Sequence, residues 1–415
     1  MSAEAQNARM WWRLEGAVLV LGGLAVLLGG CSCQGPAARD LTAGKGVPVI
    51  RVKLGDDAPS LAVAVAGPWR LAHDGRKAAS GQALAWTDLA EAGGQIVLGG
   101  RPLGPGPVEL TGDVDGSVRV RPSAGGRERA YRGIVRISRV PGGGLRAVNV
   151  LNLEGYLAGV VCNEMPSSWN LEALKAQAVA ARTFALRARN AGTRRDFDVY
   201  DSTLSQAYGG FGSETEKSRQ AVLETWAIVG TYGGKGGRGA LLPMYYHSTC
   251  GGATAAAGEI FGGTTLPPLK GVPCRYCYRS RRYEWSDVVL TKQEISEAMR
   301  RSSNAAVRAL GPLSRLEIAA TTSGGRVALV RLVDAQGASA TLRSSTFRLL
   351  VGAMRVASNW FTVEDRGDAL AFSGRGFGHG VGMCQYGAQY LAEHGKTAEE
   401  ILRYYYPGVK LARAY

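Results

Sequence analysis

The chain has 415 residues, of which 46% are hydrophobic and 20% are charged, a composition that excludes a low-complexity chain and suffices for two or three globular domains. Its 49 lysine and arginine residues, against 34 acidic residues, give a net charge of +15, which predicts a polyanionic partner. Because the positive charge is scattered along the chain, it does not distinguish nucleic acid from anionic lipid or an anionic bacterial wall.

Residues 1–30 predict export. Arg9 and Arg13 precede an apolar run from Ala17 to Leu28, which at about 12 residues is too short to cross a bilayer and suits a signal peptide. The run leads into Leu-Gly-Gly-Cys, which resembles a bacterial lipobox with Cys31 as the lipidated residue. We therefore expect a periplasmic or cell-envelope lipoprotein held to a membrane by its N-terminal lipid, a location that argues against nucleic acid as the partner. A plain signal peptide with an accidental cysteine is the alternative.

The remainder divides by local pattern. Residues 31–46 lack apolar periodicity and are expected to form a tether. Residues 47–146 contain short apolar alternations separated by Gly, Pro and Asp, which predict a β-rich N-terminal domain. Residues 147–285 and 346–415 mix helices and antiparallel strands, and we expect them to form one core that is split by an inserted α/β subunit at 286–345. The predicted fold class is therefore α+β.

Helix boundaries are indicated by capping residues. Residues 171–190 predict a long helix with Asn170 as its N-cap. Capping-box patterns at 213–216 and 397–400 predict where two further helices begin.

The first candidate site is the run VVCNEMP, which ends at Pro166. The proline disfavours helical angles at Met165, so Glu164 is expected on a turn at the end of an apolar segment, where it would be partly buried. Desolvation raises the pKa of a carboxyl group, as a general acid near neutral pH requires. A glutamate that caps the backbone of the following turn is the alternative.

The second candidate site is the glycine-rich run FGHGVGMCQYGA, residues 377–388. His379, Gln385 and Tyr386 would project there from closely packed backbone, an arrangement typical of binding sites. A buried structural histidine is the alternative.

The third candidate site combines a helix with the segment that follows it. Gln177 and Arg182 lie on the predicted helix, and Asp201, Gln206 and Tyr208 follow it. Amides, a guanidinium and aromatic faces suit a sugar polymer, whose hydroxyls need hydrogen bonds and whose apolar faces stack. A purely structural pair of Arg182 with Asp201 is the alternative.

At these three segments the chain resembles the SpoIID family (stage II sporulation protein D), which includes the LytB-type amidase enhancers. The resemblance runs from about Val148 to Tyr415, outside the inserted subunit. It is carried by LEGYLAGVVCNEMP, ALKAQAVAARTFAL, DVYDSTLSQAYGG, YYHSTCGG and GRGFGHGVGMCQYGAQYLAEHGKTAEEILRYYYPGV. It implies a lytic transglycosylase that cleaves peptidoglycan glycan strands lacking stem peptides, with Glu164 as its catalytic residue.

The implied chemistry needs one carboxyl group and no cofactor. Glu164 would protonate the glycosidic oxygen and then take the proton of the C6 hydroxyl of the same muramic residue, whose oxygen attacks C1 to give a 1,6-anhydro end. No water is activated, so a second carboxylate is unnecessary. Asp201 could stabilise the positive charge on the sugar. The enhancer branch suggests a different reading, a non-catalytic glycan-binding module with a cell-wall amidase as partner.

The cysteines allow metal or disulfide chemistry. His247 and Cys250 (HxxC) with Cys274 and Cys277 (CxxC) have the spacing of a structural zinc site. A disulfide from Cys250 to Cys274 or to Cys277 is the rival in an oxidising compartment.

Two further cysteines stand in the candidate segments. Cys162 and Cys384 are a candidate disulfide if their segments line one cleft. A nucleophilic pair of Cys384 with His379 is disfavoured, because no third group would orient the histidine.

Overall fold

The computed structural model describes residue 41 and residues 46–112, 117–123, 126–192, 195–234 and 239–415. The predicted signal peptide, Cys31 and most of the predicted tether lie outside these residues. In this described part, no helix is both long and apolar enough to cross a membrane. Helices pack beside several sheets of mostly antiparallel strands, so the fold is α+β as predicted.

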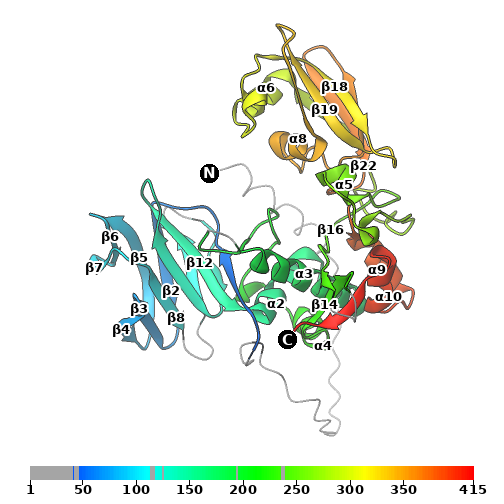
Figure 1. Ribbon diagram of the computed structural model, residues 1–415. Coiled ribbons are helices and arrows are strands. Elements are labelled where there is room, and N and C mark those ends of the chain that lie inside the picture. The colour runs from blue at the N-terminus through cyan, green and yellow to red at the C-terminus, as the bar shows by residue number, and fades with distance from the viewer. Residues whose placement is uncertain (1–40, 42–45, 113–116, 124–125, 193–194, 235–238) are drawn as a thin grey trace, which may run out of the picture.

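Two sheets form the N-terminal part of the chain (Figure 1). Their strand orders are β13-β1-β12-β11-β8-β3-β4 and β10-β9-β2-β5-β6-β7. The strands are β1 (Val49–Lys53), β2 (Ser60–Val65), β3 (Trp69–His73), β4 (Arg76–Gly81), β5 (Leu84–Ala92), β6 (Gln95–Leu98), β7 (Arg101–Gly104), β8 (Val108–Gly112), β9 (Val118–Pro122), β10 (Arg129–Tyr131), β11 (Ile134–Arg139), β12 (Leu145–Asn152) and β13 (Val199–Tyr200). Along β8 and β9 the most buried residues alternate with more exposed ones, as expected for strands with one face in the core.

The helical core surrounds one long helix. α3 (Leu171–Asn190) contacts α2 (Leu153–Glu164), α4 (Glu216–Glu224), α9 (Gln385–Glu393) and α10 (Ala398–Tyr405). Its buried face is rich in alanine, including Ala173, Ala176 and Ala180, and small side chains let neighbouring helices approach closely. Segments from both parts of the predicted split core therefore meet on α3 (Figure 1).

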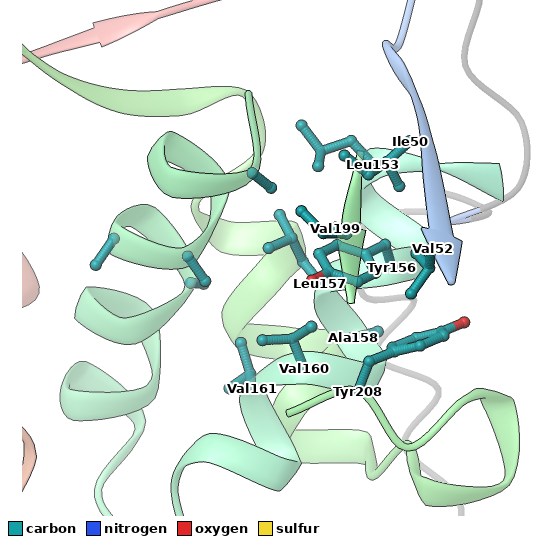
Figure 2. Close-up of a cluster of buried hydrophobic side chains, with 14 of the residues drawn as sticks. Ile50, Val52, Leu153, Tyr156, Leu157, Ala158, Val160, Val161, Val199 and Tyr208 are labelled. Carbon is teal, nitrogen blue, oxygen red and sulfur yellow. The ribbon is translucent and has the colours of Figure 1, made fainter. Parts of the chain in front are cut away.

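Helix α2 is buried along most of its length. Leu153, Tyr156, Leu157 and Val160 pack with side chains of neighbouring strands in one apolar cluster, shown in Figure 2. A helix that is apolar on most sides lies inside the protein. Because neighbouring elements pack around α2, the position of its last residue, Glu164, is fixed.

The predicted helix starts are partly confirmed. α3 spans the predicted residues with Asn170 as its N-cap, and α10 begins at the predicted capping box of Thr397. The box predicted at 213–216 is wrong: the N-cap of α4 is Thr215, paired with Ser218, because residues 211–213 form a short 3-10 turn instead.

Short elements connect this core to the outer unit and to the C-terminus. They are η1 (Phe211–Ser213), β14 (Ile228–Tyr232), β15 (Ala240–Leu241), β16 (Tyr246–His247), α5 (Ala257–Phe261), η3 (Pro267–Leu269), β23 (Met383–Cys384) and β24 (Lys410–Arg413). β16 and β23 pair in parallel, so Tyr246 lies opposite Met383 and His247 opposite Cys384.

A second hydrophobic core defines the outer unit, which extends from Trp285 to Phe372. Its elements are β17 (Glu284–Thr291), α6 (Lys292–Arg300), α7 (Ala305–Arg308), β18 (Leu313–Thr321), β19 (Val327–Asp334), β20 (Ser339–Arg343), α8 (Ser344–Val351), β21 (Phe361–Asp365) and β22 (Ala369–Arg375). The unit is larger than the predicted 286–345 subunit because β22 pairs with β17 and contributes to the same core.

Candidate active site

Glu164 is the last residue of α2. Asn152 caps the start of the helix by accepting a hydrogen bond from the backbone N–H of Gly155 at 2.7 Å. The helix ends because Met165, which precedes Pro166, adopts extended angles. The carboxyl group therefore lies at a helix C-terminus, where the helix dipole disfavours negative charge.

The surroundings of Glu164 shift its ionisation. The side chain is only partly exposed, and burial raises the pKa of the carboxyl group from 4.5 to about 7. Hydrogen bonds from the backbone N–H of Ala207, at 2.7 Å, and from the side chains of Tyr246 and Gln385 oppose this rise. Near neutral pH the group can therefore hold a proton or release it.

A chain of hydrogen bonds leads to Glu164. The Tyr156 hydroxyl donates to the amide oxygen of Gln206 at 3.1 Å, and Gln206 Nε2 donates to the Tyr246 hydroxyl oxygen at 2.9 Å. Tyr156 and Gln206 are fully buried, so the inner part of the chain is shielded from water, whereas Tyr246 is partly exposed. Gln206 was predicted to contact substrate; the structure instead places it behind Tyr246, which sequence reasoning missed.

Gln177 and Gln385 meet beside this chain. Gln385 Nε2 donates to Gln177 Oε1 at 3.3 Å, which joins α9 to α3. Gln177 is fully buried, and its Nε2 has no hydrogen-bond partner among the described residues. Gln385 also hydrogen-bonds to Glu164, so these two predicted residues do lie together with the predicted acid.

Tyr386 of α9 and Trp169, which lies just before α3, form an aromatic pair. Tyr386 follows Gln385, and its ring meets that of Trp169 edge to face at a centroid separation of 4.9 Å. Both side chains are partly exposed. Trp169 was missed in the sequence, although its position five residues after Glu164 was a usable signal.

Arg182 and Tyr208 were predicted to bind substrate but have structural roles instead. Arg182 is fully buried and pairs with Glu154 at 2.7 Å, not with Asp201, so it cannot reach a sugar. Tyr208 is buried with its hydroxyl donating to Asn149 at 2.8 Å. The sequence could not show these partners, because both come from elements distant in the chain.

His379 was also predicted to bind substrate and also has a structural role. Its Nδ1 accepts a hydrogen bond from the backbone N–H of Val381 at 3.0 Å, and its ring also bonds to the backbone of Tyr246. Burial lowers the pKa of the ring to about 3, so the ring is neutral. His379 therefore positions Tyr246, and neither ring nitrogen remains for a sugar or for Cys384.

Asp201 pairs with a residue of the β-rich region. Its carboxylate lies 2.8 Å from Arg129 Nη1. Burial raises the pKa of Asp201, and the charge of Arg129 opposes this rise. An aspartate so paired offers less negative charge to a developing cation than a free one would.

The cysteines gather differently from the predicted set. The Sγ atoms of Cys250, Cys274, Cys277 and Cys384 all lie within 4.8 Å of one another, and His247 is outside this group. His247 Nδ1 faces the carbonyl oxygen of Val381 at 3.1 Å, which holds the ring away.

The candidate disulfide of Cys162 with Cys384 is wrong. Cys162 Sγ donates to the carbonyl oxygen of Ala158 at 3.3 Å, whereas Cys384 belongs to the cysteine cluster, and both are free thiols.

Fold and site together define a class of protein in which one half-buried glutamate, at the end of a buried helix, lies among amides and tyrosines on an α+β core. Comparisons with known proteins agree. Residues 141–232 match the family model of stage II sporulation protein (SpoIID), and residues 277–382, close to the outer unit, match a domain of unknown function. The chain belongs to the SpoIID family.

Curated relatives match about two thirds of the chain. Stage II sporulation protein D of Bacillus subtilis is 30% identical over 284 residues, covering 65% of this chain and 77% of that protein. An uncharacterized protein of Brachyspira hyodysenteriae is 35% identical over 266 residues, or 64% of this chain and 67% of the relative. The amidase enhancer of Bacillus subtilis is 30% identical over 293 residues, but these cover only 40% of that protein.

Proposed function

We propose that this protein is a peptidoglycan lytic transglycosylase in which Glu164 is the sole acid and base. The observation that carries the proposal is the position of Glu164: a partly exposed carboxyl group at the end of a buried helix, where it accepts a hydrogen bond from the backbone N–H of Ala207 and burial raises its pKa to about 7. A group with this pKa is protonated often enough to act as an acid and ionised often enough to act as a base at neutral pH.

Each proton in the proposed reaction is accounted for. Protonated Glu164 gives its proton to the oxygen that links muramic acid to the next sugar, and the bond from C1 to that oxygen breaks. The C6 hydroxyl oxygen of the same muramic residue then bonds to C1, and its proton passes to the Glu164 carboxylate. The acid is restored, and the product carries a 1,6-anhydro ring without consumption of water.

The neighbours of Glu164 suit this cycle. Tyr246 and Gln385 donate hydrogen bonds to the carboxylate, which is the form present after the acid step. The partly exposed pair of Trp169 and Tyr386 offers apolar faces on which sugar rings stack. Asp201 is assigned at most a weak electrostatic role, because Arg129 balances its charge.

A second candidate function is a glycan-binding module that enhances a cell-wall amidase, favoured by the similarity to the Bacillus subtilis amidase enhancer. The two functions separate when purified wild type, Glu164→Gln and Glu216→Gln are incubated with amidase-treated glycan strands. Glu216 is an exposed control. Cleavage by wild type and Glu216→Gln but not by Glu164→Gln supports the transglycosylase. Binding by all three without cleavage supports the enhancer.

We further propose that the chain is exported and held to a membrane through lipid on Cys31. The support is the hydrophobic run and lipobox-like sequence before that residue. Labelling cells with a radioactive fatty acid should mark wild type and leave Cys31→Ala unlabelled; equal labelling of both would contradict the anchor.

A further inference from the structure

We propose that Cys250, Cys274, Cys277 and Cys384 bind one zinc ion as four thiolates, in a closed structural centre of the main core that lies beside Arg326 of the outer unit. The four sulfur atoms are buried and come from three separate segments, which the chain brings within 4.8 Å of one another. Two of them form the CxxC pair typical of zinc sites, and the others come from the YYHSTCGG and GVGMCQYG segments.

The sulfur separations fit a metal better than disulfides. Zinc bonded to four sulfurs at about 2.3 Å requires the sulfurs to lie about 3.8 Å apart, whereas a disulfide requires about 2.05 Å. Cys250 Sγ and Cys277 Sγ lie 3.4 Å apart, and all four atoms remain within 4.8 Å. The 3.4 Å separation and the 4.8 Å upper limit on the others are compatible with one tetrahedral centre.

Hydrogen-bond donors lie next to the cysteine sulfurs, as they do next to thiolates that bind a metal. The backbone N–H of Cys250 points to Cys384 Sγ at 3.3 Å, and the N–H of Gly252 points to Cys250 Sγ at 3.4 Å. The Tyr405 hydroxyl lies 3.2 Å from Cys274 Sγ. Hydrogen bonds from such an outer shell orient ligands and stabilise their charge.

A buried cation lies beside the cluster. Arg326 of the outer unit is 2% exposed, and its Nη2 donates to the carbonyl oxygens of Cys250 at 2.5 Å and Ala253 at 2.7 Å. Its Nη1 has no hydrogen-bond partner among the described residues. Four thiolates around a divalent ion leave two negative charges, and a guanidinium next to them compensates part of that charge.

The environment also leaves the centre closed. With four protein ligands no position remains for water or substrate, so the metal does not take part in cleavage. Gly387 of α9 packs against the cluster: a Cβ atom there would lie 2.9 Å from Cys274 Sγ. Metal binding would therefore fix the start of α9, where Gln385 follows Cys384 directly.

The test is the metal content of the full-length protein, purified in detergent under reducing conditions without added zinc. Elemental mass spectrometry should find one zinc per chain in wild type, in His247→Ala and in Cys162→Ser, and little in Cys384→Ser. In case Cys384→Ser fails to fold, wild type and His247→Ala are also loaded with cobalt(II), which should give the intense visible absorption of a tetrahedral thiolate complex.

Two outcomes would overturn the proposal. One is loss of zinc in His247→Ala with zinc retained in Cys384→Ser, which would restore the ligand set expected from spacing. The other is wild type without zinc whose four cysteines are found as two disulfides by intact mass under non-reducing conditions. Neither measurement involves glycan, so failure of the proposed enzymatic function would leave the metal proposal standing.

Discussion

The Tyr246 hydroxyl accepts a hydrogen bond from Gln206 Nε2 at 2.9 Å, and so its own proton points toward Glu164. Gln206 is in turn fixed by the Tyr156 hydroxyl, which donates to its amide oxygen. The order of donors and acceptors is thus set along three buried or partly buried side chains, and it ends on the carboxylate. This arrangement makes Tyr246 the side chain that most directly controls the charge of Glu164.

We predict that Tyr246→Phe raises the pKa of Glu164. The hydroxyl stabilises the ionised carboxylate, so its removal favours the protonated acid. Cleavage requires that acid, and the decline of kcat/KM at alkaline pH, expected near pH 7 in wild type, should move to higher pH. Rates at several pH values on amidase-treated glycan measure the shift; a shift to lower pH would contradict the role of Tyr246.

We predict that Glu164→Gln stabilises the fold above neutral pH. The folded pKa of about 7 exceeds the ordinary value of 4.5, so the folded state binds a proton more tightly than the unfolded state. Wild type therefore loses stability as pH rises from about 4.5 to about 7, by on the order of 1 kcal/mol after allowance for partial exposure. The variant lacks this loss. Thermal unfolding should show a higher Tm for the variant at pH 8 and similar values near pH 4, and equal values at both would refute the shifted pKa.

We predict that Arg182→Met destabilises the protein without altering glycan recognition by the molecules that remain folded. The substitution leaves the buried carboxylate of Glu154 without its ion-pair partner, which costs about 3–5 kcal/mol. Urea unfolding measures the loss. A variant of unchanged stability and a much higher KM would instead mean that Arg182 binds substrate, as the sequence first suggested.

We predict that Tyr405→Phe weakens zinc binding about tenfold, as expected when a group that orients a metal ligand is removed. The variant loses only the hydroxyl that lies 3.2 Å from Cys274 Sγ. Competition with a chromogenic zinc chelator measures the change, and Tyr404→Phe is the matched neighbour. Equal affinities of wild type and Tyr405→Phe would remove the hydroxyl from the zinc proposal.

The sequence predicted the elements of this protein better than the partners of its side chains. The helix at 171–190 and its cap at Asn170 were readable because capping and periodicity are local. The position of Glu164 at the end of an apolar segment was also local, since Pro166 ends α2. The structure adds that most residues of this helix are buried.

Partners could not be read in the same way. Arg182 pairs with Glu154, 28 residues away, and Gln177 bonds to Gln385, 208 residues away. Nothing in either local sequence specifies these contacts. Spacing likewise favoured His247 as the fourth ligand, whereas the parallel pairing of β16 with β23 brings Cys384 beside the other three cysteines. Long-range sheet pairing therefore decides the cluster.

The most direct test of the central claim is whether cleavage consumes water. Amidase-treated glycan is digested by the wild-type protein in heavy-oxygen water, and the new muramic ends are analysed by mass spectrometry. Attack by the C6 hydroxyl predicts anhydro ends without heavy oxygen, formed by wild type and absent with Glu164→Gln. Muramic ends that carry heavy oxygen would show hydrolysis and contradict the mechanism in which Glu164 is the only acid and base.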